Sequence, residues 1–307
     1  MAITKIIFLV LPQVHLLDLA GADQVFHEAI DFGVEIELEY CSMSENVKTS
    51  AGLPFGKLKH YSNVKIQPGD FLFIPGAEVS FLLSKKMESE KDLVKWVLDG
   101  YESGCTICSI CTGAFFLGMA GLLDGRKCTT HWKRTAELKK KYPAINLAEN
   151  ILFTEDNRIY TSAGVTAGID MALHITGKLK DDNLSFKIAR ELVVYMRRQG
   201  SDSQQSIFMT YRNHMHTGIH QVQDYMQVNI QNKVSLTELA DVACMSSRNL
   251  TRIFKKETGI SVNEYITLMR KDRLKALLNN PDMTRKQMAK LCGLRSERQI
   301  IRLVNTL

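Results

Sequence analysis

The chain has 307 residues, of which 45% are hydrophobic, 23% are charged and only 6 are prolines, and this composition excludes an intrinsically disordered protein. No apolar run reaches membrane-spanning length. The apolar N-terminal run leads into Pro12, His15 and Asp18 instead of a small-residue cleavage site, so we expect a buried strand there and no signal peptide. Seven cysteines without the spacing of a secreted disulfide framework favour a reduced cytoplasm.

The net charge of +6 is concentrated near the end of the chain. Residues 248–307 hold 14 Lys and Arg against 5 Asp and Glu, whereas residues 1–247 hold 25 against 28. A neutral-to-acidic body followed by a strongly basic segment is typical of a protein with a polyanion-binding module. The charge distribution therefore predicts such a module in the C-terminal part.

Strand and helix patterns alternate through the first two thirds of the chain. We expect strands at 4–11, 34–43, 71–74 and 104–110, and a strand pair within 147–161. We expect helices before Gly33 and at 88–103, 115–123, 133–142, 164–178 and 181–198. Asp170 is expected to be a turn residue or to face solvent. The alternation predicts a parallel sheet with helices on both faces, and ligands of such sheets bind at the carboxyl ends of the strands.

Residues 104–132 hold the most informative stretch. A buried strand runs directly into an apolar helix at Cys111-Thr112-Gly113, which is typical of a nucleophile elbow. The position of Cys111 at the start of a helix predicts a lowered thiol pKa and a thiolate. Asp18 and the pair Gly76-Ala77 also follow strands directly, so we expect them to converge with Cys111 on one pocket.

Cys105, Cys108 and Cys111 form a CxxCxxC spacing that invites an iron–sulfur interpretation. However, the first two lie inside a predicted buried strand, where successive side chains point to opposite faces. The sequence therefore predicts no metal site and no cofactor.

The segment 111–132, CTGAFFLGMAGLLDGRKCTTHW, closely resembles a signature of the glutamine-amidotransferase-like superfamily, nearest to its PfpI/isocyanide-hydratase-like branch. Residues 17–21, LDLAG, and 161–170, TSAGVTAGID, match two further signatures of that branch. The resemblance spans residues 3–178 and implies an α/β, amidotransferase/flavodoxin-like domain. In isocyanide hydratases the cysteine is paired with an aspartate of the first strand–helix loop and is followed by a threonine. Asp18, Cys111 and Thr112 match these positions.

No catalytic residue is firm, although Cys111, Asp18 and Thr112 are candidates. Amide hydrolysis in this superfamily needs a histidine close to the thiol. Thr112 occupies the position after the cysteine, and no His-x-Glu pair follows the elbow, so a Cys–His hydrolase is not expected. We expect a ligand-binding pocket more than a catalytic site. The residues predicted to line it are Asp18, Gly76, Ala77, Cys111, Thr112 and His131.

After a polar segment at 199–205 the pattern becomes purely helical. Leu239-Ala240, Met245-Ser246 and Leu250-x-Arg252-x-Phe254 resemble the AraC/XylS-type DNA-binding domain, and the resemblance covers 216–307. It implies an all-α, double helix–turn–helix domain with a linking helix at about 262–279 and a second recognition helix at 296–307. The final basic stretch and short helix of the family do not follow in this sequence, so the resemblance implies a truncated second module.

Two sets of residues match the DNA-reading positions of this family. Arg248, Asn249 and Arg252 fall at the start of the helix that follows the first helix–turn–helix turn. Arginine there can pair with guanine and asparagine with adenine. The matching places in the second module are held by Glu297, Arg298 and Arg302.

These resemblances imply a ligand-sensing domain at 1–198, a linker at 199–215 and a DNA-binding domain at 216–307. The predicted protein is a cytoplasmic, dimeric transcription regulator and not an enzyme. Its expected partners are promoter DNA, a small nitrogen-containing effector, a second copy bound through the N-terminal domain, and RNA polymerase, with no membrane. The alternatives are an isocyanide-hydratase-like thiol enzyme that uses Cys111 and Asp18, and a degenerate copy that only dimerises.

Overall fold

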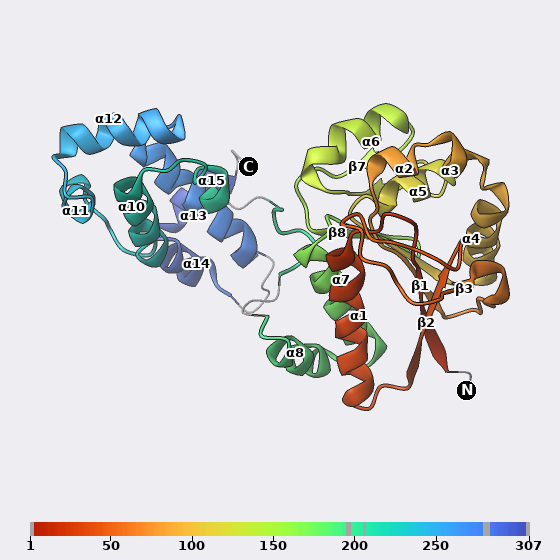
Figure 1. Ribbon diagram of the computed structural model, residues 1–307. Coiled ribbons are helices and arrows are strands. Elements are labelled where there is room, and N and C mark those ends of the chain that lie inside the picture. The colour runs from red at the N-terminus through yellow and green to blue at the C-terminus, as the bar shows by residue number, and fades with distance from the viewer. Residues whose placement is uncertain (1–2, 195–197, 205–206, 279–282, 305–307) are drawn as a thin grey trace. The chain divides into compact units, whose positions relative to one another are not determined.

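The computed structural model describes residues 3–194, 198–204, 207–278 and 283–304. The chain divides into two compact units, 1–204 and 205–307 (Figure 1). The backbone N–H of Leu152 donates to the carbonyl oxygens of Gly200 and Asp202, so the first residues of the predicted linker belong to the first unit.

The first unit is built on a seven-stranded sheet in the order β3-β2-β1-β4-β5-β9-β8. Its strands are β1 (Thr4–Leu9), β2 (Ile36–Ser42), β3 (Lys59–His60), β4 (Phe71–Ile74), β5 (Thr106–Ile110), β8 (Phe153–Asp156) and β9 (Ile159–Ser162). All neighbouring strands pair in parallel except β8 and β9, which form an antiparallel pair. A two-stranded parallel ribbon, β6 (Lys127–Cys128) with β7 (Asn146–Leu147), accompanies the sheet.

Alternation along the strands builds a separate core on each face of the sheet. In β1, Ile6 and Phe8 pack into one hydrophobic cluster, whereas Ile7 and Leu9 pack into the other. The first cluster is covered by α1 (Leu16–Asp31), α7 (Thr166–Leu179) and α8 (Asp182–Glu191). The second is covered by α2 (Val79–Leu82), α3 (Lys85–Ser89), α4 (Lys91–Ser103), α5 (Gly113–Met119) and α6 (Thr135–Lys141) (Figure 1). The predicted parallel sheet with helices on both faces is confirmed.

Two local predictions in this unit are wrong. The helix expected at 181–198 ends at Glu191, because Leu192 caps it and Val193 takes a positive φ of 55°; the part of the prediction at 195–197 lies outside the described residues. Asp170 does not face solvent: it is 4% exposed and accepts hydrogen bonds from the Arg198 guanidinium, at 3.0 Å for Nε. The compensating cation lies 28 residues away in the sequence, too far for a local pattern to reveal it.

The described part of the second unit is helical, as predicted. Its helices are α9 (Ile207–Thr210), α10 (Thr217–Val228), α11 (Leu236–Val242), α12 (Ser247–Thr258), α13 (Val262–Leu278), α14 (Arg285–Leu291) and α15 (Glu297–Val304). A capping box opens α11, because Ser235 and Glu238 bond each other's backbone, and Thr284 with Gln287 forms a second one at α14. The predicted linking helix at 262–279 and the predicted recognition helix at 296–307 both end outside the described residues, at 279 and at 305–307.

The two helix–turn–helix pairs have separate hydrophobic cores. Phe254 and Tyr265 are fully buried in the cluster under α10 to α13, with ring centroids 5.4 Å apart. Leu274, Met288 and Ile300 form a smaller cluster that holds α14 and α15 to the end of α13. Among the described residues, we find no helix that combines the length and the apolar character needed to cross a membrane.

Phe254 packs in a cluster of the second unit that shares no residue with the two clusters of the first unit. Phe254→Ala should therefore lower the free energy of unfolding of the second unit by about 3–5 kcal/mol, the usual cost of a buried Phe-to-Ala change. Amide hydrogen exchange in the first unit should stay unchanged. The matched control is Ile301→Ala on the 49%-exposed side chain of the same unit, which should cost about 0.5 kcal/mol or less. An equal loss of protection in both units after Phe254→Ala would contradict two independent cores.

Candidate functional site

The elbow at Cys111 is confirmed by the backbone. Cys111 lies between β5 and α5 with a positive φ of 56°, a conformation that a side chain with a Cβ rarely adopts. The following glycine is required by the same turn, because a Cβ on Gly113 would lie 2.1 Å from the carbonyl oxygen of Ile74 in β4. The Cys-x-Gly pattern therefore reflects the close approach of α5 to the neighbouring strand.

Two further glycines enclose the thiol. A Cβ on Gly76, after β4, would lie 2.4 Å from Asp18 Oδ2 and 2.8 Å from Thr112 Oγ1. A Cβ on Gly164, after β9, would lie 2.7 Å from Cys111 Sγ, and this glycine has a φ of 90°. The predicted convergence of Asp18, Gly76 and Cys111 past the strand ends is thus what the structure shows.

Asp18 is a buried carboxylate that is only partly satisfied. It is 1% exposed, and its Oδ1 accepts the backbone N–H of Val165 at 2.6 Å. Val165 has a φ of 51°, which is strained for a β-branched residue. Oδ2 lies 3.4 Å from His15 Nδ1, close enough for an ion pair, but it accepts no well-formed hydrogen bond from the described residues. Because buried polar atoms are usually hydrogen-bonded, Oδ2 is expected to accept a hydrogen bond from a further donor.

The hydroxyl of Thr112 is already used within the protein. It donates to the carbonyl oxygen of Ala77 at 2.7 Å and accepts the backbone N–H of Ala77 at 3.0 Å. Thr112 and Ala77 therefore fix the loop after β4 against the elbow. Both were predicted to line the pocket, and the structure gives them this positioning role.

The prediction of a thiolate at Cys111 is wrong. Burial, and then the negative charge of Asp18, raise the pKa of the Cys111 thiol well above its ordinary value. The side chain is 5% exposed, and α5 has only seven residues, so its dipole offsets little of this cost. Burial and the Asp18 carboxylate therefore both oppose formation of the Cys111 thiolate.

Two histidines flank the carboxylate with opposite shifts. The contact with Asp18 raises the pKa of His15, and Glu78 Oε1, which lies 3.6 Å from His15 Nε2, adds to the increase. Burial, together with the charge of Lys133, lowers the pKa of His131. His131 Nδ1 also accepts the backbone N–H of Lys133 at 3.3 Å, so one of its nitrogens caps the following turn. The site therefore combines a carboxylate with one imidazole whose charged form is favoured and one whose neutral form is favoured.

The arrangement also permits metal ligation. His15, Asp18 and Cys111 each place a ligand atom within 4.8 Å of the other two, a donor set that suits zinc if the thiol loses its proton. The CxxCxxC spacing forms no cluster, because Cys105 and Cys108 pack into cores on opposite faces of the sheet, as predicted.

Sequence analysis missed four residues of this site, namely His15, Glu78, Gly164 and Val165. His15 carried a local signal, since it stands three residues before Asp18 at the start of α1, and Gly164 and Val165 lie within the 161–170 signature. Glu78 follows β4 in the chain, and only the sheet order brings it together with the other three.

A second candidate site lies on α12. Arg248 and Arg252 are exposed, and with Thr251, Lys255 and Lys256 they line an open hollow of about 530 Å³. The Arg252 Nη2 donates to Asn249 Oδ1 at 2.9 Å, so Asn249 orients the guanidinium. The three predicted DNA-reading residues of the first module are therefore together on one basic face.

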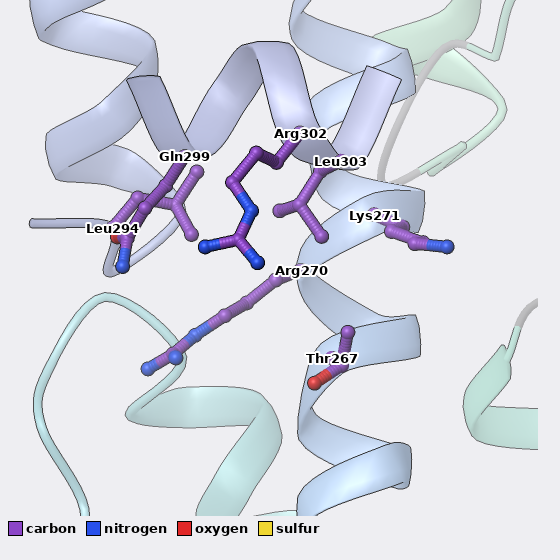
Figure 2. A pocket seen from close by; sticks show the side chains of 7 residues that line it. All are labelled: Thr267, Arg270, Lys271, Leu294, Gln299, Arg302 and Leu303. Carbon is purple, nitrogen blue, oxygen red and sulfur yellow. The ribbon is translucent and has the colours of Figure 1, made fainter. Parts of the chain in front are cut away.

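The second module differs from this arrangement. Glu297 and Arg298 are exposed in the first turn of α15, where a recognition helix would present them. Arg302 instead lines a cavity between α15 and α13, together with Arg270 (Figure 2). Direct contact of any of these six residues with DNA stays a prediction.

The comparisons with known proteins agree with this division. The model of the DJ-1/PfpI family matches residues 4–178, which is more than half of the chain. This chain belongs to the DJ-1/PfpI family. A helix–turn–helix domain model matches residues 239–306. Both resemblances predicted from the sequence are confirmed.

Relatives of this DJ-1/PfpI chain include regulators and an enzyme. The HTH-type transcriptional regulator GbdR of Pseudomonas aeruginosa is 31% identical over 189 residues, which cover 60% of this chain and 50% of that protein. Isonitrile hydratase of Pseudomonas putida is 31% identical over 172 residues, covering 56% of this chain and 70% of the hydratase. A solved THiJ/PfpI family protein of Pseudomonas syringae has a TM-score of 0.55 at 25% identity, covering 67% and 81% of the two chains. The chain thus spans about half the length of the first of these relatives.

A thiol held neutral by burial and by Asp18 should react slowly with iodoacetamide at pH 7, and its rate should keep rising with pH. Asp18→Asn removes the negative charge, lowers the thiol pKa and should speed alkylation at pH 8. The gain should be about threefold for each unit of pKa, because the larger thiolate fraction is partly offset by the lower nucleophilicity of a less basic thiolate. Mass spectrometry can follow Cys111 beside the exposed Cys244, which serves as the reference within each sample. A full alkylation rate at pH 7 that Asp18→Asn leaves unchanged would show that Cys111 is a thiolate after all.

Proposed function

We propose that this protein is a cytoplasmic transcription regulator whose AraC-type domain binds promoter DNA and whose DJ-1/PfpI domain binds a small nitrogen-containing effector. The observation that carries the proposal is the pairing of two separate structures in one chain. One is a helix–turn–helix unit with a basic recognition face, and the other is an elbow site that holds its thiol neutral. A catalytic thiol would have to be ionised, whereas a binding pocket would not.

The DNA-binding part of the proposal is supported by charge and by helix geometry. α12 follows the turn after α11 and presents Arg248 and Arg252 beside two lysines. Such a face can place arginine forks on guanine edges and lysines on phosphates. Two relatives named HTH-type transcriptional regulators are 31% and 28% identical to this chain over 189 and 204 residues.

The effector-binding part is supported by the state of Asp18. Its Oδ2 is buried without a well-formed hydrogen bond from the described residues, beside a strained backbone at Val165. An N–H group of a small ligand would supply the missing donor, which favours an amine or amide nitrogen.

The exposed apolar side chains Leu17 and Trp132, 50% and 43% exposed, lie close in sequence to Asp18 and His131 and suit a dimer contact through this domain.

Hydrogen bonds connect this pocket to the residues that lead into the second unit. Arg198 Nη2 donates to Thr166 Oγ1 at 2.7 Å, and Thr166 follows Val165, whose N–H is held by Asp18. On a second path, Thr130 Oγ1 donates to the Cys111 carbonyl oxygen at 2.7 Å. The carbonyl oxygen of Thr130 accepts Gln204 Nε2 at 2.9 Å. A ligand that moves Asp18 or the elbow would therefore change how residues 198–204 are held.

For the DNA-binding part, Arg252→Ala should weaken binding to a preferred site by about 1–3 kcal/mol and blunt discrimination against other sequences. Footprinting on genomic fragments identifies the site, and fluorescence anisotropy at several salt concentrations measures the affinity. Lys140→Ala, on the exposed face of α6 in the first unit, is the charge-matched control and should have no effect. Absence of any protected sequence at low salt would refute the regulator.

For the connection between the units, Asp18→Asn should raise amide hydrogen exchange within residues 198–204, because it weakens the acceptor for the Val165 N–H. The matched control is Asp23→Asn on the same helix, since Asp23 bonds the Tyr40 hydroxyl away from the pocket. The control should leave exchange at 198–204 unchanged. If Asp18→Asn also leaves it unchanged, the pocket and this segment are not coupled.

A thiol enzyme is the second candidate function, and the contact between Asp18 and Cys111 is the observation that favours it. A hydration of isocyanides would need both residues. Turnover of an isocyanide by the purified protein that is lost in both Cys111→Ala and Asp18→Asn would establish the enzyme. Equal rates in the wild type and both variants would dismiss it.

A further inference from the structure

Three side chains with the chemistry of metal ligands meet at the elbow. A ring nitrogen of His15, a carboxylate oxygen of Asp18 and the Sγ of Cys111 lie within 4.8 Å of one another. His15 Nδ1 and Asp18 Oδ2 are 3.4 Å apart. Two ligand atoms that each lie about 2.0 Å from a tetrahedral ion are about 3.3 Å apart. The nitrogen and the oxygen therefore already have the spacing of two zinc ligands.

The Asp18 carboxylate supplies a second, independent observation. Its side chain is 1% exposed, and Oδ2 has no hydrogen-bond partner among the described residues. The other oxygen, Oδ1, accepts the backbone N–H of Val165 at 2.6 Å, and this bond fixes the direction of the carboxylate. The backbone at Gly76 and Gly164 packs so closely that an added Cβ would lie 2.4 Å from Oδ2 and 2.7 Å from Cys111 Sγ, respectively. The oxygen and the sulfur are therefore held in place by the main chain.

Solvent reaches these atoms past His15. Its side chain is 32% exposed, whereas Cys111 is 5% exposed. The imidazole belongs to none of the hydrophobic clusters, so its rotation disturbs no core. The ring can therefore turn aside to admit an ion and then close over it. An ion needs only the space between its ligand atoms, so the burial of Asp18 Oδ2 does not prevent binding once the ring has moved.

A second carboxylate supports the histidine. A histidine that binds a metal usually donates its other ring N–H to a carboxylate, a carbonyl oxygen or water, and this outer contact orients the ring. Glu78 Oε1 lies 3.6 Å from His15 Nε2, on the far side of the ring from Asp18. His15 thus faces one carboxylate with each nitrogen. This is the order carboxylate–histidine–metal, in which the ion would lie next to Nδ1.

We propose that His15 Nδ1, Asp18 Oδ2 and Cys111 Sγ bind one zinc ion and leave a fourth position for water or another ligand. A nitrogen, an oxygen and a sulfur ligand suit zinc, and the sulfur disfavours magnesium and calcium. Zn²⁺ takes the place of the thiol proton and of a proton on Nδ1, and both protons go to solvent. The charge of Asp18 opposes a bare thiolate, but it helps to balance the charge of a bound ion. The sequence prediction of no metal site did not weigh His15.

A zinc ion at this place would exclude the proposed effector. Both occupants need Asp18 Oδ2, one as a ligand and the other as the acceptor of an N–H group. The ion would also tie the start of α1 to the elbow that precedes α5. The zinc site does not rest on effector binding or on DNA binding, and zinc binding can be measured in the absence of both.

The test titrates the full chain at pH 8 with Zn²⁺ in competition with a chromogenic chelator, and then with Co²⁺ as a spectroscopic substitute. The wild type should bind one ion per chain, and its cobalt complex should show a sulfur-to-cobalt charge-transfer band in the near ultraviolet. Cys111→Ser should remove this band. Asp18→Asn should weaken zinc binding by at least about tenfold, because loss of a ligand costs no less than loss of an outer partner.

Two further variants separate this site from adventitious binding. Glu78→Gln keeps all three ligands, so it should keep the cobalt band and weaken zinc binding by about tenfold. The matched control is His27→Gln, because His27 also lies 3.6 Å from a carboxylate on α1, that of Asp31, and should bind zinc like the wild type. If Asp18→Asn or Cys111→Ser fails to fold, His15→Gln decides by the loss of zinc affinity.

Three results would overturn the zinc site. The first is a wild type without a sulfur-to-cobalt band. The second is a band that persists in Cys111→Ser, which would place the ion on another cysteine such as the exposed Cys244. The third is equal zinc affinity in the wild type, Asp18→Asn and His15→Gln. None of these results bears on whether the chain regulates transcription, so the failure of either proposal can be told from the failure of the other.

Discussion

The turn at Cys111 constrains its whole neighbourhood. A positive φ at the end of β5 sends the chain straight into α5, and this leaves no space for a Cβ at Gly113 or Gly164. The same crowding applies to Gly76, whose backbone lies against Asp18 and Thr112. Four adjacent strands, β1, β4, β5 and β9, therefore deliver their following loops to one point. The convergence of these loops is a consequence of backbone packing before any side-chain chemistry is considered.

Electrostatics then decide what the pocket can do. Burial and Asp18 keep the proton on Cys111, so the elbow presents a neutral thiol next to a fixed carboxylate. In an elbow used for nucleophilic catalysis the opposite balance is needed, with a positive partner that stabilises the thiolate. His15 is the one neighbour with a raised pKa, and its charge is directed at Asp18 and Glu78. The arrangement favours recognition of a hydrogen-bond donor over attack on a carbonyl or an isocyanide.

Much of this could be predicted from the sequence, and the failures have physical causes. The parallel sheet, the elbow and the double helix–turn–helix follow from local patterns such as Cys-x-Gly and the capping boxes. The thiolate prediction weighed the helix dipole, which is local, and could not weigh burial, which depends on the whole sheet. Asp170 was misplaced for the same reason, since its partner Arg198 is distant in sequence. Arg302 matched a DNA-reading position, yet its side chain lines a cavity with Arg270, because the packing of α15 on α13 decides its direction.

The account joins the two units by function, and so its central claim is that occupancy near Asp18 changes DNA binding. The most direct measurement is the affinity of the full chain for a selected DNA fragment, with and without a small-molecule extract of the producing cells. The account predicts that the extract shifts the affinity of the wild type and that Asp18→Asn abolishes the shift, because a coupling between two sites must pass through both. An extract that changes nothing in the wild type, or changes both proteins equally, would contradict it.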